Sequence, residues 1–187
     1  YGAGHSDLVM GALVFKDAEY RKQVFFAAYT LGACPSAFDC YLCLRSLKTL
    51  ELRILASTRN AYHIAHFLEK HPNVENVIYA GLKSHKSHEL ARKQMRGFGG
   101  MLSFRVKGGK EQASKFLRAL KVFTLAESLG GVESLAQVPF FMTHGSVPLE
   151  ARKELGITEN LIRLSVGVED MDDLVADINN GLEASQK

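Results

Sequence analysis

Residues 161–182 read LIRLSVGVEDMDDLVADINNGL and predict a strand that leads directly into a helix. Apolar and polar residues alternate over 161–166, which is the period of a β-strand with one covered face. Acidic residues crowd positions 169–173, where negative charge stabilises the N-terminal end of a helix. Apolar side chains then recur at helical spacing, at Leu174, Val175, Ile178 and Leu182. A strand and a helix with one apolar side each predict a layered α/β fold.

The rest of the chain alternates in the same way. Residues 101–106 alternate as cleanly as 161–166, and we also expect strands at 74–79 and in the uninterrupted apolar run 8–15. Helices are predicted, from capping residues and apolar periodicity, at 17–32, 36–71, 89–95, 111–123, 148–155 and from 169 onward.

The helix predicted over 36–71 is unusually long. Asp17 and Ser36 are the expected N-caps of the first two helices, and Gly32 ends the first. No proline or glycine interrupts the second before Pro72, so it would measure about 50 Å. We therefore expect it to bend, to break, or to run between two lobes. A boundary near 72–81 and a single lobe with an N-terminal extension both remain open.

The composition excludes several classes of protein. Of the 187 residues 47% are hydrophobic and 23% charged, which is ordinary for a globular domain, and the net charge of +3 is spread along the chain. No basic block or aromatic–basic alternation indicates a nucleic-acid surface. The longest apolar run is too short to cross a bilayer. We expect no signal peptide, and the first residues resemble the interior of a longer protein.

Neither the cysteines nor the histidines predict a metal site. The three cysteines lie within ten positions, at Cys34, Cys40 and Cys43. Their C-x-x-C pair falls in a predicted helix and has no second pair at zinc-site spacing, so we expect reduced thiols and a cytosolic protein. Two histidine pairs three apart, at 63/66 and 85/88, lack a carboxylate or cysteine that would complete a ligand set.

Arg163 is the strongest candidate for a binding residue. A strand holds an arginine in place, so its planar guanidinium can meet a carboxylate in two parallel hydrogen bonds, although a strand arginine is often only part of an exposed ion pair. Glu127 and Ser128 precede Gly130 and Gly131, whose backbone can approach a ligand closely. An ordinary helix end followed by a glycine turn, without any ligand, would have the same sequence.

Several segments, in one order along nearly the whole chain, resemble the cystathionine γ-lyase and γ-synthase family of Cys/Met metabolism PLP-dependent enzymes. They are YGAGHSD (1–7), DCYLCLR (39–45), LKTL (47–50), VIYAGL (77–82), FTLAESLGGVESL (123–135), MTH (142–144) and LIRLSVGVED (161–170).

The resemblance implies a PLP-dependent transferase fold of type I, of which this chain covers the C-terminal part only. Residues 1–70 would be the end of the large, cofactor-binding domain with the long interdomain helix, and residues 71–187 the small α/β domain. By the family pattern Arg163 binds the substrate α-carboxylate, while Ser128 and Thr143 build its surroundings. Glu127 would face the distal end of the substrate, and it favours cystathionine over methionine.

The cofactor implied is pyridoxal 5'-phosphate. In the family pattern the lysine that carries it immediately precedes Tyr1, so we expect no catalytic residue in this chain and assign none of its residues to the cofactor. The chain by itself is then expected to be inactive.

The resemblance predicts a homotetramer, built as a dimer of dimers, that acts on a small amino acid in transsulfuration. From the composition and the cysteines we expect it to be cytoplasmic and to bind neither nucleic acid nor membrane. The expected reaction is α,γ-elimination of cystathionine to cysteine, 2-oxobutanoate and ammonia. Two alternatives remain open: a cystathionine γ-synthase, and a non-catalytic domain fragment without the Schiff-base lysine.

Overall fold

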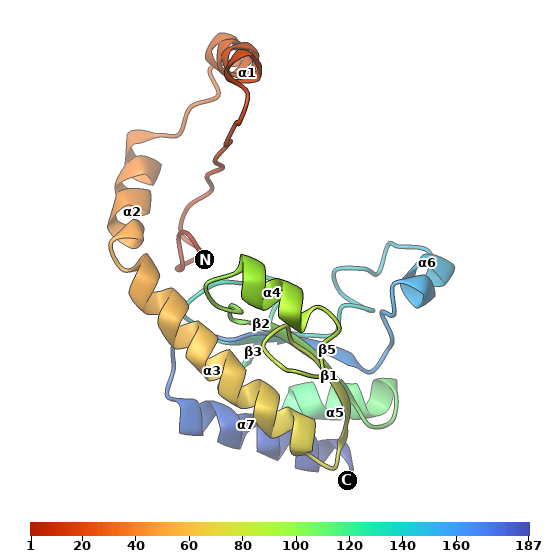
Figure 1. The fold of residues 1–187 in the computed structure, drawn as a ribbon. Coiled ribbons are helices and arrows are strands. Elements are labelled where there is room, and N and C mark those ends of the chain that lie inside the picture. The colour runs from red at the N-terminus through yellow and green to blue at the C-terminus, as the bar shows by residue number, and fades with distance from the viewer.

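The computed structural model describes residues 1–187 and has a five-stranded sheet at the centre of its C-terminal part (Figure 1). The strand order is β1-β2-β5-β4-β3. All neighbours are antiparallel except β3 and β4, which are parallel. The strands are β1 Val74–Ile78, β2 Met101–Val106, β3 Thr124–Leu125, β4 Leu135–Gln137 and β5 Leu161–Ser165.

Seven helices surround or extend from this sheet. They are α1 Ala18–Leu31, α2 Ala37–Leu47, α3 Leu50–Lys70, α4 His88–Gln94, α5 Lys110–Ala119, α6 Leu149–Glu154 and α7 Met171–Ser185. Helices α3, α5 and α7 supply the apolar side chains that cover one face of the sheet. None of the helices combines the length and the apolar composition of a membrane span. The mixed sheet with helices confirms the predicted α/β class.

The core lies between the sheet and these three helices. It is one cluster of 21 buried apolar residues, and Phe104 of β2 meets Phe116 of α5 edge to face with ring centroids 5.4 Å apart. The Asp177 carboxylate of α7 is also buried and accepts three backbone N–H groups, from residues 121–123 at 2.7–3.0 Å. Those bonds hold residues 121–123, which follow α5, against α7.

The predicted caps are confirmed. Asp17 accepts hydrogen bonds at the start of α1, Gly32 ends α1 in the left-handed conformation, and Ser36 caps α2. The long helix breaks at Lys48 and Thr49 into α2 and α3. A turn closes the break, in which the Thr49 hydroxyl donates back to the Ser46 carbonyl at 3.2 Å.

The strand predicted at 8–15 is wrong. This segment is extended without any strand partner, and Val9 and Val14 are 95% and 96% exposed. An apolar run becomes a strand only where another strand satisfies its backbone groups, and this chain offers none there. The prediction of helix over 111–123 is wrong at its end, because α5 stops at Ala119 and Phe123 leads into β3.

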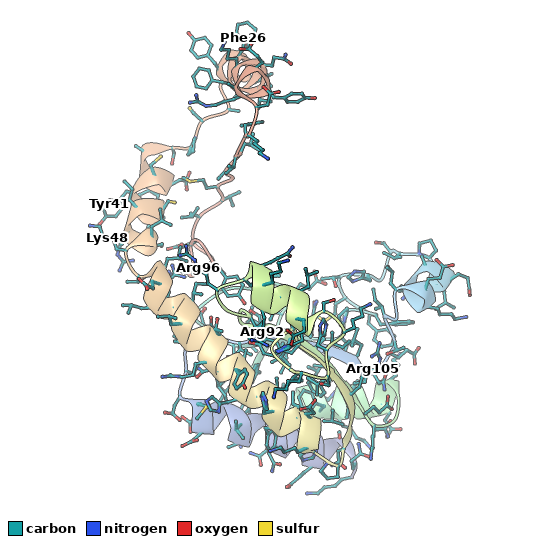
Figure 2. All side chains as sticks on the ribbon, viewed as in Figure 1. Phe26, Tyr41, Lys48, Arg92, Arg96 and Arg105 are labelled. Atoms are coloured by element: carbon teal, nitrogen blue, oxygen red, sulfur yellow. The ribbon has the colours of Figure 1, made fainter.

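Residues 5–49 extend away from the sheet (Figure 1). No residue of α1 is buried, and its aromatic side chains project outward, as Phe26 does in Figure 2. Phe25, Phe26 and Tyr29 are 68%, 69% and 77% exposed. Several large apolar side chains exposed on one short helix are typical of a segment that another part of a protein covers.

Candidate active site

Arg163 stands in the middle of β5, on the sheet face opposite the core. Its strand neighbours are Ser103 of β2 and Gln137 of β4, whereas Ile162 and Leu164 on either side of it point into the core and are fully buried. The side chain itself is partly buried. The backbone of three paired strands therefore fixes the base of this side chain.

The guanidinium group of Arg163 turns toward the loop that follows β3. Its Nη2 donates to the backbone oxygens of Glu127 and Ser128, at 2.8 and 2.7 Å. The predicted residues Arg163, Glu127 and Ser128 are thus brought together, but through the backbone of the two loop residues.

Gln137 is a site residue that sequence reasoning missed. In the amide orientation that gives both of its ends a partner, its oxygen accepts from Arg163 Nη1 at 2.9 Å and Nε at 3.2 Å. Gln137 is only 1% exposed. Thr143 Oγ1 lies 3.4 Å from the Gln137 amide and 2.9 Å from His144 Nδ1. Gln137 therefore links Thr143, the fourth predicted residue, to Arg163.

Burial and nearby charge act on Arg163 in opposite directions. Burial lowers the pKa of the guanidinium, while Glu127 and Tyr1 raise it. An arginine starts from so high a pKa that it keeps its proton at neutral pH. The partly dry surroundings also strengthen any charge-assisted hydrogen bond that it makes.

Gly130 allows the chain start to approach this loop. Its φ is +77°, and a Cβ there would lie 2.4 Å from the Tyr1 nitrogen, so only glycine fits. The Gly130 N–H donates to Ser165 Oγ on β5 at 2.8 Å. Gly130 thus takes a positive φ and brings Tyr1 against the loop that contacts Arg163, whereas the predicted close approach to a ligand stays a prediction.

The Tyr1 ring packs against Gly130 of the same loop, and its hydroxyl reaches Gly100, just before β2. A Cβ at Gly100 would stand 2.8 Å from its hydroxyl. Burial raises the pKa of the Tyr1 hydroxyl, against smaller opposing effects of the Gly100 backbone, Ser165 and Arg163. The Tyr1 hydroxyl is thus buried close enough for the charge of Arg163 to act on it, while the Tyr1 nitrogen lies against Gly130 of the loop.

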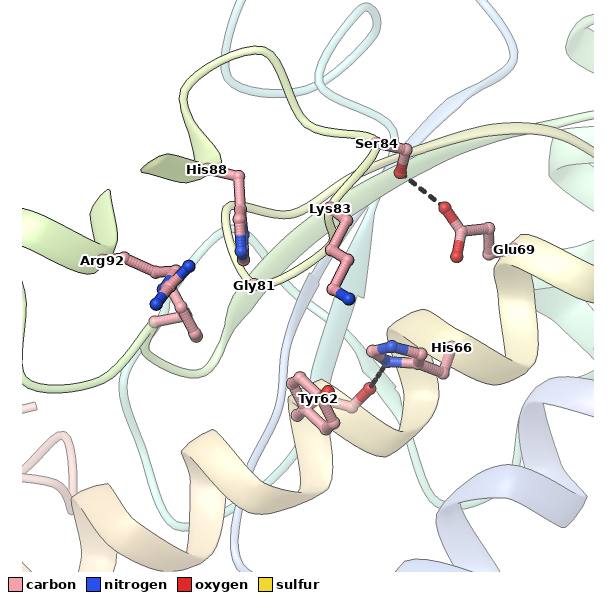
Figure 3. A pocket seen from close by; sticks show the side chains of 9 residues that line it. Tyr62, His66, Glu69, Gly81, Lys83, Ser84, His88 and Arg92 are labelled. Carbon is pink, nitrogen blue, oxygen red and sulfur yellow. Dashed lines mark hydrogen bonds between the residues drawn. The ribbon is translucent and has the colours of Figure 1, made fainter. Parts of the chain in front are cut away.

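The structure has no group of three or more His, Cys, Asp or Glu side chains placed to hold a metal ion, and its three cysteines are free. Instead, one histidine of each sequence pair, His66 and His88, lines a hollow of roughly 390 Å³ between α3 and α4 (Figure 3). Lys83 and Arg92 also line it, and its Glu69 accepts a hydrogen bond from Ser84. The hollow shares no lining residue with the Arg163 site.

Residues 1–183 match the family model described as Cys/Met metabolism PLP-dependent enzyme. The chain is 55% identical over 183 residues to a cystathionine γ-lyase of Dictyostelium discoideum, covering 98% of this chain and 47% of that protein. It is 50% identical over 185 residues to the Homo sapiens cystathionine γ-lyase, covering 99% of this chain and 46% of that protein. The chain spans about half the length of the curated relatives it matches.

Solved structures resemble the whole chain. A cystathionine γ-lyase from yeast superimposes with a TM-score of 0.96 at 47% identity, over 100% of this chain and 48% of that one. A cystathionine γ-synthase from Xanthomonas oryzae pv. oryzae, solved with cystathionine, gives a TM-score of 0.95 at 45% identity over the same shares.

Proposed function

Because this chain belongs to the Cys/Met metabolism PLP-dependent enzymes, we propose that the whole protein is a cystathionine γ-lyase. It would split cystathionine, with one water, into cysteine, 2-oxobutanoate and ammonia by α,γ-elimination. The observation that carries the proposal is the Arg163 guanidinium, which a sheet presents to the same 127–131 loop against which the Tyr1 nitrogen lies. The 50–55% identity to proteins named cystathionine γ-lyase supports the choice of reaction.

Arg163 would bind the substrate α-carboxylate by exchanging partners. Two N–H groups of Nη2 and one each of Nε and Nη1 already have acceptors, so one of its five donors is free. A two-pronged hold on a carboxylate therefore displaces at least one neutral acceptor. The exchange is favourable because a carboxylate brings a full negative charge to the guanidinium and can accept two parallel hydrogen bonds from it, which a neutral carbonyl oxygen cannot. Displacement of the Glu127 or Ser128 carbonyl would also move the loop on binding.

The remaining site residues would surround the substrate. Ser128 and Thr143 would supply hydroxyl groups near the carboxylate, and Thr143 already touches the Gln137 amide. Glu127, whose charge acts on Arg163, would face the distal ammonium of cystathionine. Gln137 would hold the guanidinium plane in orientation while the loop moves.

The donor set of this chain fits the amino-acid substrate of pyridoxal phosphate chemistry, because it offers a cation that can bind a carboxylate on the same loop that the Tyr1 nitrogen contacts. A lysine bonded to that nitrogen would hold the cofactor, and we assign no residue of this chain to its phosphate or ring. When bound, the cofactor acts as an electron sink that makes the substrate's Cα and Cβ protons acidic. Arg163 would fix the carboxylate, so that the Cα–H bond faces the lysine amine that takes up its proton.

A cystathionine γ-synthase is the second candidate, since the superposition on the Xanthomonas synthase is nearly as close as that on the yeast lyase. A non-catalytic fragment is the candidate of another class. We further propose a cytoplasmic homotetramer, a dimer of dimers, that acts in transsulfuration.

For the domains, we propose that residues 1–70 form the end of the large domain with the linking helix, and residues 71–187 the small domain. The packing refines this proposal. Ala61, Ile64 and Leu68 of α3 are fully buried in the sheet core, so the linking helix would be anchored in the small domain.

An assay of the purified whole protein decides among these candidates. Cystathionine as sole substrate should release cysteine and 2-oxobutanoate in equal amounts. A requirement for an acylated homoserine plus cysteine would favour the synthase. A protein that is inactive in both assays and binds no pyridoxal phosphate would leave only the non-catalytic candidate.

A further inference from the structure

Arg53 is a buried cation without an acidic partner. It stands in the first turn of α3 and is 9% exposed. Its acceptors are all neutral: the Tyr1 carbonyl oxygen at 2.7 Å, the Gly2 carbonyl oxygen at 3.1 Å, the Ser46 carbonyl oxygen at 2.9 Å and Thr49 Oγ1 at 3.1 Å. A buried charge that no carboxylate neutralises is costly to keep, so its presence calls for a purpose beyond stability.

The fork of Arg53 joins two parts of the chain about 50 residues apart. One side of the guanidinium holds the backbone of Tyr1 and Gly2, and the other holds Ser46 and Thr49 at the break between α2 and α3. Gly4 makes room for it, because a Cβ there would lie 2.2 Å from Arg53 Nη1 and the φ of Gly4 is +76°. Residues 1, 2 and 4 therefore all contact this one side chain.

The same short segment meets the substrate loop on its other side. The Val132 N–H donates to the Gly4 oxygen at 2.9 Å, and the Tyr1 nitrogen lies against Gly130. Residues 1–4 are therefore held between Arg53 and the 127–132 loop that contacts Arg163. Contacts thus restrain the segment on both of its sides.

We propose that Arg53 is a positioning residue, which fixes where the residue bonded to the Tyr1 nitrogen stands relative to Arg163. The inference rests on the proposed function in taking that residue to be the cofactor-binding lysine. Arg53 donates a hydrogen bond to the carbonyl oxygen of Tyr1, the residue that would follow the lysine. A shift of the Arg53 guanidinium would therefore displace the lysine backbone, while β5 keeps Arg163 in place. The distance between amine and carboxylate clamp then changes, and errors of about 1 Å can cost about 10²-fold in rate.

The test compares Arg53→Lys with Arg59→Lys in the whole protein. A lysine keeps the charge but cannot reach carbonyls on several sides with one planar fork. Arg59 is exposed on the same helix and serves as the matched control. We expect Arg53→Lys to lower kcat about 10²-fold with KM changed less than threefold, and to slow borohydride trapping of the lysine–cofactor adduct. Hydrogen exchange should rise at residues 1–4 and 130–132 and stay unchanged in β2 and β5.

A merely structural role predicts a lower melting temperature with unchanged kcat, trapping and local exchange, and that result overturns the inference. Should Arg53→Lys fail to fold, Thr49→Val decides, since it removes the acceptor of Arg53 Nε and, besides that, only the local bond from the same hydroxyl to the Ser46 oxygen. A several-fold fall in kcat and trapping supports the inference, and unchanged values overturn it. An inactive wild-type protein would contradict the proposed function alone, because local exchange still reports whether Arg53 holds residues 1–4.

Discussion

The N-terminal extension (residues 5–49) and the sheet layer (residues 50–187) obey the same local rules but differ in what holds them. In the extension only Ser46 is buried, although α1 and α2 are properly capped. In the sheet layer a single cluster of 21 apolar residues joins three helices to the sheet. Caps and helix periodicity thus decide where a helix begins and ends, whereas burial needs partners from elsewhere in the fold.

The exposed apolar side chains of the extension follow from this difference. Phe25, Phe26 and Tyr29 on α1 and the run 8–15 find no partner in this chain. Since the chain spans about half the length of its relatives, we expect the other half of the protein to cover them. An isolated helix as short as α1 is marginal in water, so its stability should depend on that cover.

Hydrogen exchange gives the largest expected contrast. In the isolated 187-residue chain, amides of α1 should exchange nearly as fast as in an unfolded peptide, whereas β2 and β5 should be protected by the global stability, about 5–15 kcal/mol or over 10³-fold. In the whole protein α1 should become protected. Equal protection of α1 and β5 in the isolated chain would contradict the division.

Arg163 tests whether the sheet layer carries substrate recognition. Arg163→Ala removes the guanidinium that would hold the carboxylate, and we expect kcat/KM for cystathionine to fall about 10³-fold, or about 4 kcal/mol. Arg163→Lys should recover only part of the loss, because an ammonium cannot bind in the two-pronged way. Arg118→Ala, exposed on α5, is the control. A change below about fivefold for Arg163→Ala would remove Arg163 from the site.

Asp177 tests the packing of the sheet layer without touching the site. Asp177→Asn keeps the shape but replaces one acceptor oxygen with a donor that faces backbone N–H groups. We expect unfolding free energy to fall by about 3 kcal/mol, measured by urea denaturation of the isolated chain. Asp173→Asn, exposed on the same helix, should cost much less. Equal losses in the two variants would show that the buried bonds contribute little.

Sequence patterns predicted some strands correctly and missed others. The alternation over 101–106 and 161–166 is long enough to detect, and both strands are confirmed as β2 and β5. Strands β3 and β4 have two and three residues, too few to show a period. They exist because β3 pairs with β4 and β4 pairs with β5. The extended run 8–15 failed for the opposite reason, since its pattern is clear but its partner strand is missing.

The site was predictable where one residue's chemistry carried the signal. Arg163 stands out as a cation on a polar strand face, and the glycine turn that follows them singled out Glu127 and Ser128. The family resemblance added Thr143 and the expected role of each residue. Gln137 could not be found, because its contact depends on the register that sets it opposite Arg163. Arg53 was missed for a similar reason: its contacts with Tyr1 and Gly2 span 52 and 51 positions, which no local pattern records.

The smallest effect concerns an ion pair on the surface of the sheet layer, in α5. Lys115 Nζ lies 2.7 Å from Glu111 Oε1, and its hydrogen bond and charge lower the pKa of the Glu111 carboxyl. A depressed pKa means that the pair stabilises α5 above the ordinary carboxyl pKa of about 4.3 and loses this effect as the pH falls through the lowered value. Carbon-detected NMR titration of Glu111 should show the lowered pKa, and Lys115→Met should return it toward the ordinary range. High salt should do the same, because water and ions screen an exposed pair. An unchanged titration in Lys115→Met would mean that the helix terminus, rather than its partner, sets the charge of Glu111.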